Sequence, residues 1–350
     1  MTARVRIRPV GRSGLCVSEL ALGAAPLGNL YEPVTDAMAR SLIDAALQAG
    51  ITYFDTAPFY GFGLSERRVG DGLRGHSHAI VSTKVGRLLV ANASIKDDAI
   101  RHGFRSAMPF EPVFDYTRDG ILRSWEASVH RLGLAQIDIL YLHDIGIDTH
   151  GPADAEMWAA LTKGGGLRAL ETLRDDGSIR AFGIGVNETA ACLRVMEHTR
   201  LDAVLLAGRY TLLEQGAVDR LLPACLSAGT AVIVGAPYNS GILALGTRSG
   251  RIPNYNYRAA PPHILARVAR IESICDRHAI PLPAAALQFP LAHPQVASVV
   301  AGVANLAQLE TTLHNHRLAI PLDFWTDLKS EGLMHPDSIV PGQRPPATRL

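Results

Sequence analysis

The sequence has little charge, and its charges nearly cancel. Only 19% of the 350 residues are charged, and 34 basic residues face 33 acidic ones, for a formal net charge of +1. Domains that bind nucleic acid usually carry a clear basic excess. The balance therefore gives no reason to expect a nucleic-acid partner, and we expect the partner to be a small-molecule substrate. Nothing in the composition indicates an oligomeric state.

Cysteine is scarce as well. The four cysteines are widely spaced and form no Cys-x-x-Cys pair: Cys16, Cys192, Cys225 and Cys275. Such spacing excludes a disulfide framework of the kind that holds small secreted domains together. We expect reduced, buried thiols, as in a cytoplasmic protein.

Long hydrophobic runs are missing. No apolar run is long enough to span a bilayer, and residues 1–14 contain four arginines without the apolar segment of a secretory signal. The expected location is therefore the cytoplasm, without membrane contact.

Two nucleotide-binding signatures are missing too. No Gly-x-Gly-x-x-Gly follows an early strand, although a doubly wound dinucleotide-binding sheet would need one. The run Gly164–Gly166 has no Lys-Ser/Thr behind it, so it is predicted to be a flexible hinge and not a phosphate loop.

Hydrophobic residues are plentiful, at 47%, and they alternate between strand-like and helix-like segments. Eight strands separated by helices predict a single (β/α)8 barrel domain over residues 1–350. A hairpin is expected ahead of the barrel, between residues 4 and 17, and long loops after strands three, four and seven. The eight predicted strands are 20–23, 51–55, 79–84, 138–143, 181–187, 203–206, 231–236 and 296–301.

The long loop after strand three, residues 86–116, is predicted to be irregular. Four aromatic residues argue against a simple solvent-exposed linker: Phe104, Phe110, Phe114 and Tyr116. Long loops in compact domains are usually functional. These rings could form a wall of the substrate pocket or a separate hydrophobic cluster.

Polar residues mark the carboxyl ends of four predicted strands. Asp55 ends strand two, Lys84 strand three, His143 strand four and Asn187 strand five, while Tyr60 follows on the loop after Asp55. In (β/α)8 barrels the active site lies at this end of the strands. The pattern therefore predicts one shared site.

The residue types in this set suit acid–base chemistry. A tyrosine has an ordinary pKa of about 10, and the ammonium of Lys84 would stabilise the phenolate of Tyr60 and lower that pKa. A buried lysine needs a counter-charge, which Asp55 supplies, and His143 can hydrogen-bond the reacting oxygen. We expect a general acid/base with a polarising partner.

The segment Phe54–Ala57, with Tyr60, Gly61, Ser65 and Glu66, followed by Lys84 and by Leu142–His143, resembles the aldo-keto reductase superfamily. Phrases at 69–73, 115–120 and 238–241 resemble more narrowly its D-threo-aldose (L-fucose) 1-dehydrogenase branch and the pyridoxal 4-dehydrogenases. The resemblance implies a nicotinamide cofactor bound without a Rossmann domain, and a catalytic tetrad on Tyr60, Lys84, Asp55 and His143.

The resemblance also implies a cofactor site. Asn187 matches the asparagine that binds the carboxamide, and two segments match those at the pyrophosphate and the adenosine phosphate. The residues carried over are Tyr238, Asn239, Ser240 and Gly241 for the first segment, and Gly302, Asn305 and Gln308 for the second.

The sequence departs from the family pattern in three respects. Gly235 stands where many relatives have an aromatic residue stacked on the nicotinamide, and Ala207 where the family has a glutamine. Gly302 and Gln308 replace basic residues that hold a 2′-phosphate. A dianionic phosphate is bound best by Arg or Lys, so we predict NAD as cofactor, with NADP as the alternative.

The predicted function is NAD-dependent oxidation of a cyclic hemiacetal, such as L-fucose, to its lactone. The alternatives are a pyridoxal 4-dehydrogenase, an NAD(P)H-dependent aldehyde or ketone reductase, a sensor barrel that binds the cofactor without catalysis, and a metal hydrolase. His143, Asp144, Asp148 and His150 could form a metal cluster, but we interpret them as a polar loop and predict no metal.

Overall fold

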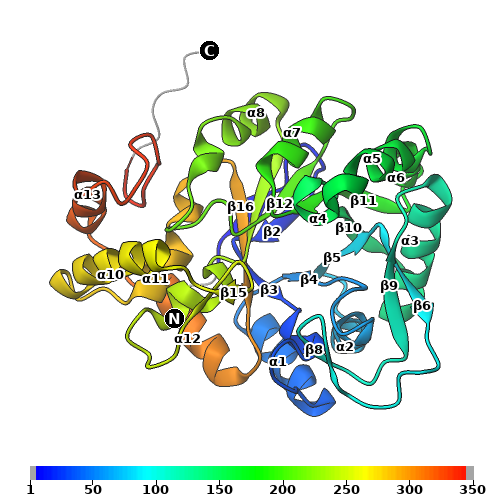
Figure 1. Ribbon diagram of the computed structural model, residues 1–350, viewed down its shortest axis with the longest axis horizontal. Helices are drawn as coiled ribbons and strands as arrows, with labels where there is room; N and C mark the ends of the chain where they lie inside the picture. Colours follow the sequence, from blue (N-terminus) through cyan, green and yellow to red (C-terminus); the bar gives the residue numbers. More distant parts are fainter. Residues whose placement is uncertain (1–4, 344–350) are drawn as a thin grey trace.

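Eight parallel strands form a closed barrel at the centre of the chain, as a computed structural model of residues 5–343 shows (Figure 1). Around the barrel the order is β10, β11, β12, β13, β16, β3, β4 and β5. The predicted (β/α)8 barrel is confirmed. The strands are β3 (Leu20–Gly23), β4 (Tyr53–Asp55), β5 (Ile80–Val85), β10 (Ile137–His143), β11 (Ile179–Val186), β12 (Ala203–Ala207), β13 (Ala231–Gly235) and β16 (Val296–Gly302).

Helices surround the barrel, and local signals explain several of their ends. Thr35 caps α1 by accepting a hydrogen bond from the Met38 amide, and Gly133 ends α3 in the left-handed conformation. The helices between the strands are α1 (Asp36–Gln48), α2 (Leu64–Leu73), α3 (Arg118–Leu132), α6 (Gly166–Asp175), α7 (Thr189–Met196), α8 (Leu221–Ala228), α11 (Leu282–Gln288) and α12 (Leu306–Arg317).

Prolines shorten two of the predicted helices. The sequence predicts helix over 215–228, but α8 begins only at Leu221, because Pro223 is tolerated only in a first turn. A helix predicted over 284–292 ends at Gln288, and a 3-10 turn follows from Pro290. Two further helices lie beside the barrel, as Figure 1 shows: α10 (Pro262–Arg277) and α13 (Leu322–Ser330).

The predicted N-terminal hairpin closes one end of the barrel. Strands β1 (Ile7–Pro9) and β2 (Cys16–Ser18) pair antiparallel. Val10, Leu15 and Val17 belong to the same buried cluster as the side chains inside the barrel. The turn at Gly11 (φ +52°) lies against the carbonyls of Asp202 and Gly229, which precede strands β12 and β13. The hairpin therefore fills the amino-terminal end, opposite the predicted site.

The loop after β5 is not irregular, so that prediction is wrong. Strands β6 (Arg87–Ala91) and β9 (Phe110–Phe114) form an antiparallel ribbon, with a small hairpin of β7 (Ile100–Arg101) and β8 (Phe104–Arg105) between them. The ribbon lies at the lower right of Figure 1. Ala91 pairs with Phe110, so almost twenty residues of sequence separate the two strands at this end of the ribbon. Local sequence patterns do not reveal such a pairing.

Two other predicted loops contain regular structure. The loop after β10 contains α4 (Ile147–His150) and α5 (Asp154–Thr162). Two acidic residues in the first turn of α5 favour a helix there. The loop after β13 contains α9 (Ile242–Leu245) and a hairpin of β14 (Asn254–Tyr255) and β15 (Arg258–Ala259).

The four cysteines are all unpaired, and three of them are buried, but Cys16 is exposed, contrary to expectation. Within residues 5–343 no helix is both long enough and apolar enough to cross a bilayer.

Candidate active site

Strand alternation explains why polar residues gather inside one end of the barrel. Successive side chains on a strand point to opposite faces. On β4, β5 and β10 the outward residues Phe54, Val81 and Leu142 pack in the main core between barrel and helices. The inward residues form two polar layers, the upper one being Asp55, Lys84 and His143 and the lower one Tyr53, Ser82 and Tyr141.

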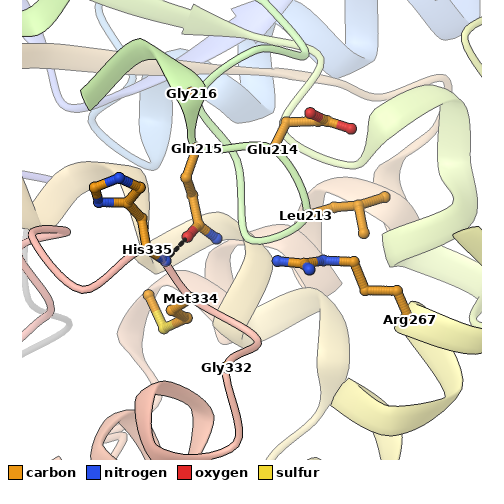
Figure 2. A pocket seen from close by; sticks show the side chains of 8 residues that line it. All are labelled: Leu213, Glu214, Gln215, Gly216, Arg267, Gly332, Met334 and His335. Carbon is orange, nitrogen blue, oxygen red and sulfur yellow. Dashed lines mark hydrogen bonds between the residues drawn. The ribbon is translucent and has the colours of Figure 1, made fainter. Parts of the chain in front are cut away.

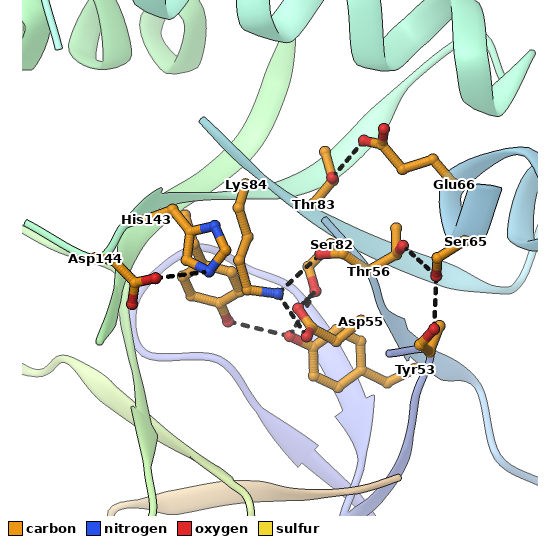
Figure 3. Close-up of polar contacts among 12 residues, drawn as sticks. Tyr53, Asp55, Thr56, Ser65, Glu66, Ser82, Thr83, Lys84, His143 and Asp144 are labelled. Atoms are coloured by element: carbon orange, nitrogen blue, oxygen red, sulfur yellow. Dashed lines mark hydrogen bonds and ion pairs between the residues drawn. The ribbon is translucent and has the colours of Figure 1, made fainter. Parts of the chain in front are cut away.

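The upper layer is centred on a buried ion pair. The ammonium nitrogen Nζ of Lys84 lies 2.7 Å from Asp55 Oδ2 and donates a second hydrogen bond, 2.8 Å long, to the Thr56 carbonyl (Figure 3). Both side chains are at most 4% exposed. Two charges so deeply buried are stable only when they are paired and hydrogen-bonded.

The lower layer holds Asp55 in place. Ser82 Oγ donates to the other carboxylate oxygen, Oδ1, at 2.6 Å. Tyr53 OH lies 3.0 Å from Ser82 Oγ and 3.1 Å from the hydroxyl of Tyr141. The chain of buried hydroxyls therefore fixes the orientation of the carboxylate that pairs with Lys84.

Tyr60 enters the site from the loop after β4. Its ring centroid lies 4.7 Å from the Lys84 ammonium and 6.3 Å from the His143 ring. The loop is fixed from below, because Ser65 Oγ donates to the Ala24 carbonyl at 2.6 Å and lies 2.8 Å from Thr56 Oγ1. The structure thus brings Tyr60, Lys84, Asp55 and His143 together as the sequence predicts.

Burial and charge set the protonation states. Burial raises the pKa of Tyr60 above its ordinary value, and the nearby Lys84 ammonium only partly opposes this. Lys84 does lower the pKa of Tyr60, as the sequence predicts, but burial raises this pKa by more. For Lys84 burial favours the neutral amine, yet the Asp55 carboxylate raises the pKa overall. Burial, with Arg87 and Lys84 nearby, holds the pKa of His143 well below its usual range, so its ring is neutral.

A cavity of about 400 Å³ opens beside these residues. Tyr60, Lys84 and His143 line it, together with Asn187. Most of the other lining residues are aromatic, aliphatic or small, and two are charged: Ala25, Leu30, Tyr31, Phe59, Arg87, His102, Gly103, Phe104, Asp144, Gly185, Val186, Leu205, Ala207 and Tyr257. Binding sites for small ligands commonly have this size and a mainly apolar lining.

Some aromatic residues of the 86–116 segment line the cavity, and others pack in the hydrophobic core. Phe104 lines the cavity, and its ring stacks on Tyr60 with centroids 6.1 Å apart. Tyr116 is buried, and its hydroxyl donates to the His143 carbonyl at 2.7 Å and lies 3.0 Å from His150 Nε2. Phe114 stacks on Tyr116, so these two rings form a hydrophobic cluster, while Phe104 belongs to the cavity wall.

Asn187 lies at the rim as predicted. Its Nδ2 donates to the Ala207 carbonyl at 3.0 Å, which leaves its Oδ1 available toward the cavity. Ala207 and Gly185 are small, so a flat ring has space beside Lys84 and Tyr60. The residues present therefore fit the nicotinamide end of a dinucleotide.

The other predicted cofactor residues do not line this cavity. Asn239 is buried, and its side chain bonds Thr211 Oγ1 at 2.6 Å and the Gly208 carbonyl at 3.0 Å. Ser240 Oγ accepts from the Tyr257 amide, while Tyr238 is partly buried and Gly241 has φ +100°. These residues shape the loop after β13.

At the adjacent strand end, two side chains cap α12. Asn305 Oδ1 accepts from the Gln308 amide at 3.0 Å, and Gln308 Oε1 accepts from the Ala304 amide at 2.8 Å. Gly302 ends β16 next to them. Within residues 5–343, the side-chain NH2 group of Gln308 remains free to donate a hydrogen bond to a ligand.

Within residues 5–343 no three His, Cys, Asp or Glu side chains are arranged to hold a metal ion. His150 contacts Tyr116 instead, and the Asp148 amide donates to Glu188.

A second cavity of about 400 Å³ lies between the loop after β12, helix α10 and the segment after α13 (Figure 2). Gln215 Oε1 accepts there from the His335 amide at 2.5 Å. None of the four predicted catalytic residues lines it.

Comparison with known proteins decides the family. The family model described as "Aldo/keto reductase family" matches residues 19–330. The chain belongs to the aldo/keto reductase family. Members are oxidoreductases that act on CH–OH or carbonyl groups with a nicotinamide cofactor, and this barrel is one of them.

Two characterised relatives are similar over nearly the whole chain. Pyridoxal 4-dehydrogenase of Microbacterium luteolum is 44% identical over 93% of this chain and 97% of its own length. D-threo-aldose 1-dehydrogenase of a Pseudomonas species is 39% identical, over 92% and 96% respectively. These relatives match the branch that the sequence resembles.

Solved structures share the fold of this aldo/keto reductase. An aldo-keto reductase from Bacillus halodurans, in its holo form, superposes with a TM-score of 0.72 at 23% identity, covering 97% of this chain and 99% of that one. A glycerol dehydrogenase from Gluconobacter oxydans gives 0.70 at 22% identity, covering 97% and 98%.

Sequence reasoning missed several residues of this aldo/keto reductase's cavity. Phe59 and Asp144 directly adjoin Tyr60 and His143, and Arg87 lies three residues after Lys84, so proximity could have pointed to them. Tyr257 comes from the β14–β15 hairpin, more than a hundred residues later, and no local signal connects it with the site.

Proposed function

We propose that this aldo/keto reductase oxidises a cyclic hemiacetal to its lactone, with NAD as the hydride acceptor and Tyr60 as the general base. The observation that carries the proposal is the Tyr60–Lys84–Asp55 group, buried beside His143 at one end of a cavity for small molecules. The names of the two relatives support the substrate class, because sugars and pyridoxal both form cyclic hemiacetals.

In this reaction the hemiacetal carbon is oxidised and its hydroxyl becomes the lactone carbonyl. A nicotinamide held by Asn187 would supply the acceptor for the hydride and its electron pair. Tyr60, as phenolate, takes the hydroxyl proton, and the neutral ring of His143 hydrogen-bonds the same oxygen. The ammonium of Lys84 stabilises the phenolate, and Asp55 keeps the lysine charged and in place.

Residues around the cavity support binding of the cofactor. Asn187 would hold the carboxamide through its available Oδ1, with the ring next to Gly185 and Ala207. The loops that contain Tyr238–Gly241 and Gly302–Gln308 follow the neighbouring strands β13 and β16, where the rest of the dinucleotide would lie.

The charges and partners of the candidate phosphate-binding residues support NAD over NADP. Arg248, a cation that could hold a 2′-phosphate, pairs with Asp276 at 2.7 Å. Arg209 donates to Asn256 and to the Gly208 carbonyl. Gly302 and Gln308 carry no charge, so a 2′-phosphate would lack a strong counter-charge.

Replacing Tyr60 by Phe tests the assignment. The variant keeps the ring that packs on Phe104 but loses the proton acceptor, so kcat should fall about 10²–10⁴-fold. The dissociation constant for NADH, measured by fluorescence titration, should stay close to that of the parent protein. A folded variant with near-normal turnover of L-fucose and pyridoxal would refute the role of Tyr60.

A further inference from the structure

A second ion pair lies in the same cavity. Arg87 begins β6 and Asp144 follows β10, and the guanidinium Nη2 of Arg87 donates to Asp144 Oδ2. The two side chains are 12% and 17% exposed, and both line the cavity beside Tyr60 and His143. The pair is therefore buried in the protein on one side and open to the cavity on the other.

Both charged groups are held rigidly. The guanidinium carbon Cζ of Arg87 lies 4.2 Å from the ring centroid of Phe59 and 4.7 Å from that of Phe114, so the group stands between two rings. Asp144 has φ +52°, a conformation that Asp and Asn tolerate better than most residues, and its amide donates to the Gly185 carbonyl at 3.0 Å. Little conformational freedom is left to lose when a ligand binds.

The pair keeps unused hydrogen-bonding capacity. Within residues 5–343, Asp144 Oδ1 and Arg87 Nη1 make no hydrogen bond, and neither is among the fully buried polar atoms. A carboxylate can only accept and a guanidinium can only donate, whereas a hydroxyl does both. A hydroxyl placed between them would satisfy both groups at once.

The position of the Arg87–Asp144 pair indicates which hydroxyl of the substrate it could bind. Asp144 Oδ2 lies 3.5 Å from His143 Nε2, so the pair adjoins the group proposed to bind the reacting oxygen. We propose that Arg87 and Asp144 bind a ring hydroxyl of the substrate next to its hemiacetal carbon, an inference that rests on the proposed function. The hydroxyl is either that of the neighbouring carbon in a sugar or, one carbon further away, the ring hydroxyl of pyridoxal.

The test removes the hydroxyl from the substrate and the charges from the protein. L-Fucose is compared with 2-deoxy-L-fucose, and pyridoxal with 3-deoxypyridoxal, with the NAD-loaded enzyme. Hydrogen bonds to charged groups predict at least a tenfold loss of kcat/KM for the deoxy compound in one of the two comparisons. The comparison that shows the loss identifies the source of the hydroxyl.

In the variant Arg87→Met/Asp144→Asn the ratio between parent and deoxy compound should fall to about threefold or less. Both charges are removed together because a single replacement would leave one buried charge unpaired. Asn suits the left-handed position of residue 144, and Met is an uncharged, unbranched side chain that fills much of the space between Phe59 and Phe114.

Arg101→Met is the matched control. Arg101 also pairs with a carboxylate, that of Glu111, and lies 3.9 Å from the ring centroid of Phe62, but it does not line the cavity. This variant should keep the ratio of the parent protein, even if its stability falls. If the Arg87–Asp144 pair had a purely structural role, the double variant and Arg101→Met would both be less stable. The ratio of kcat/KM between parent and deoxy compound would then be unchanged in both variants.

Calorimetric binding to the NADH-loaded protein separates the two proposals, because it needs no turnover. Absence of NAD reduction with all four compounds would refute the proposed reaction. Equal affinities for parent and deoxy compounds in both comparisons, or a ratio that survives in the double variant, would refute the hydroxyl site.

Discussion

Lys84 contacts three groups on which the proposed chemistry depends: Asp55, the Thr56 carbonyl and the ring of Tyr60. Its ammonium lowers the pKa of Tyr60, while burial raises it and prevails. Tyr60 is therefore a phenol at neutral pH. Since oxidation needs the phenolate, its rate should rise with pH through the alkaline range.

Replacing Lys84 by Met should move this rise to still higher pH, because the contribution that lowers the pKa of Tyr60 is lost while burial remains. We expect kcat for oxidation to fall at least tenfold at neutral pH and to recover partly as pH increases. The measurement is kcat against pH for the parent protein and for Lys84→Met. The variant Lys84→Met/Asp55→Asn, in which no buried carboxylate is left unpaired, is measured beside them. An unshifted profile with reduced kcat would contradict this role of the lysine.

At Gln308 a single replacement should alter the choice of cofactor. The parent protein should prefer NAD about tenfold or more in kcat/KM, because no basic residue stands at this position. Gln308→Arg should narrow the difference by improving the affinity for NADP. Gln308→Met, which also loses the bond to the Ala304 amide but adds no charge, is the control. Equal kcat/KM values for NAD and NADP in the parent protein would refute the prediction that this site favours NAD.

At the scale of elements, the β6–β9 ribbon and the β7–β8 hairpin form one wall of the cavity. Phe104 in β8 is 2% exposed, and its ring contacts both Tyr60 and Phe59. Arg87 and the neighbouring Phe114 come from the two long strands of the ribbon. The segment therefore combines a structural cluster with residues that line the cavity.

Phe104→Leu should raise KM for the substrate several-fold and leave the dissociation constant for NADH nearly unchanged. Leucine keeps the site apolar but removes the flat ring that stacks on Tyr60. Phe110→Leu is the matched control, because Phe110 lies in β9 of the same ribbon and does not line the cavity. If KM changes equally in both variants, the effect comes from the stability of the ribbon and not from contact with the substrate.

At the scale of the whole molecule, the N-terminal hairpin and the candidate active site lie at opposite ends of the barrel. The β1–β2 hairpin fills the amino-terminal end, while the polar layers that contain Lys84 and His143 lie at the carboxyl end. A change at one end should therefore leave the other intact, provided that the protein remains folded.

Leu15→Ala should test this separation. Leu15 is 1% exposed, and its truncation should lower the free energy of unfolding by about 2–5 kcal/mol, measured by urea denaturation. The values of kcat and KM at about 25 °C should stay within about twofold of those of the parent protein. Ile7→Ala in the same hairpin, where the side chain is 53% exposed, should cost about 0.5 kcal/mol or less. Lower kcat in a folded Leu15→Ala protein would show that the two ends are coupled.

The sequence alone determined the barrel and the position of its central residues. Alternating strands and helices have local signals, and the end of a parallel strand is recognisable from where an apolar run meets a polar residue. Asp55, Lys84 and His143 stand at such ends, and barrel closure necessarily brings strand ends together. These predictions needed only local pattern and one rule of topology.

Only the tertiary structure decided which residues complete the cavity. Arg87 and Asp144 are 57 residues apart, and the ribbon that carries Arg87 pairs strands across an intervening hairpin. Such contacts depend on register and on the path of loops, which local propensity does not encode. The balance at Tyr60 was decided in the same way, because the degree of burial that raises its pKa is a property of the folded chain and not of the neighbouring sequence.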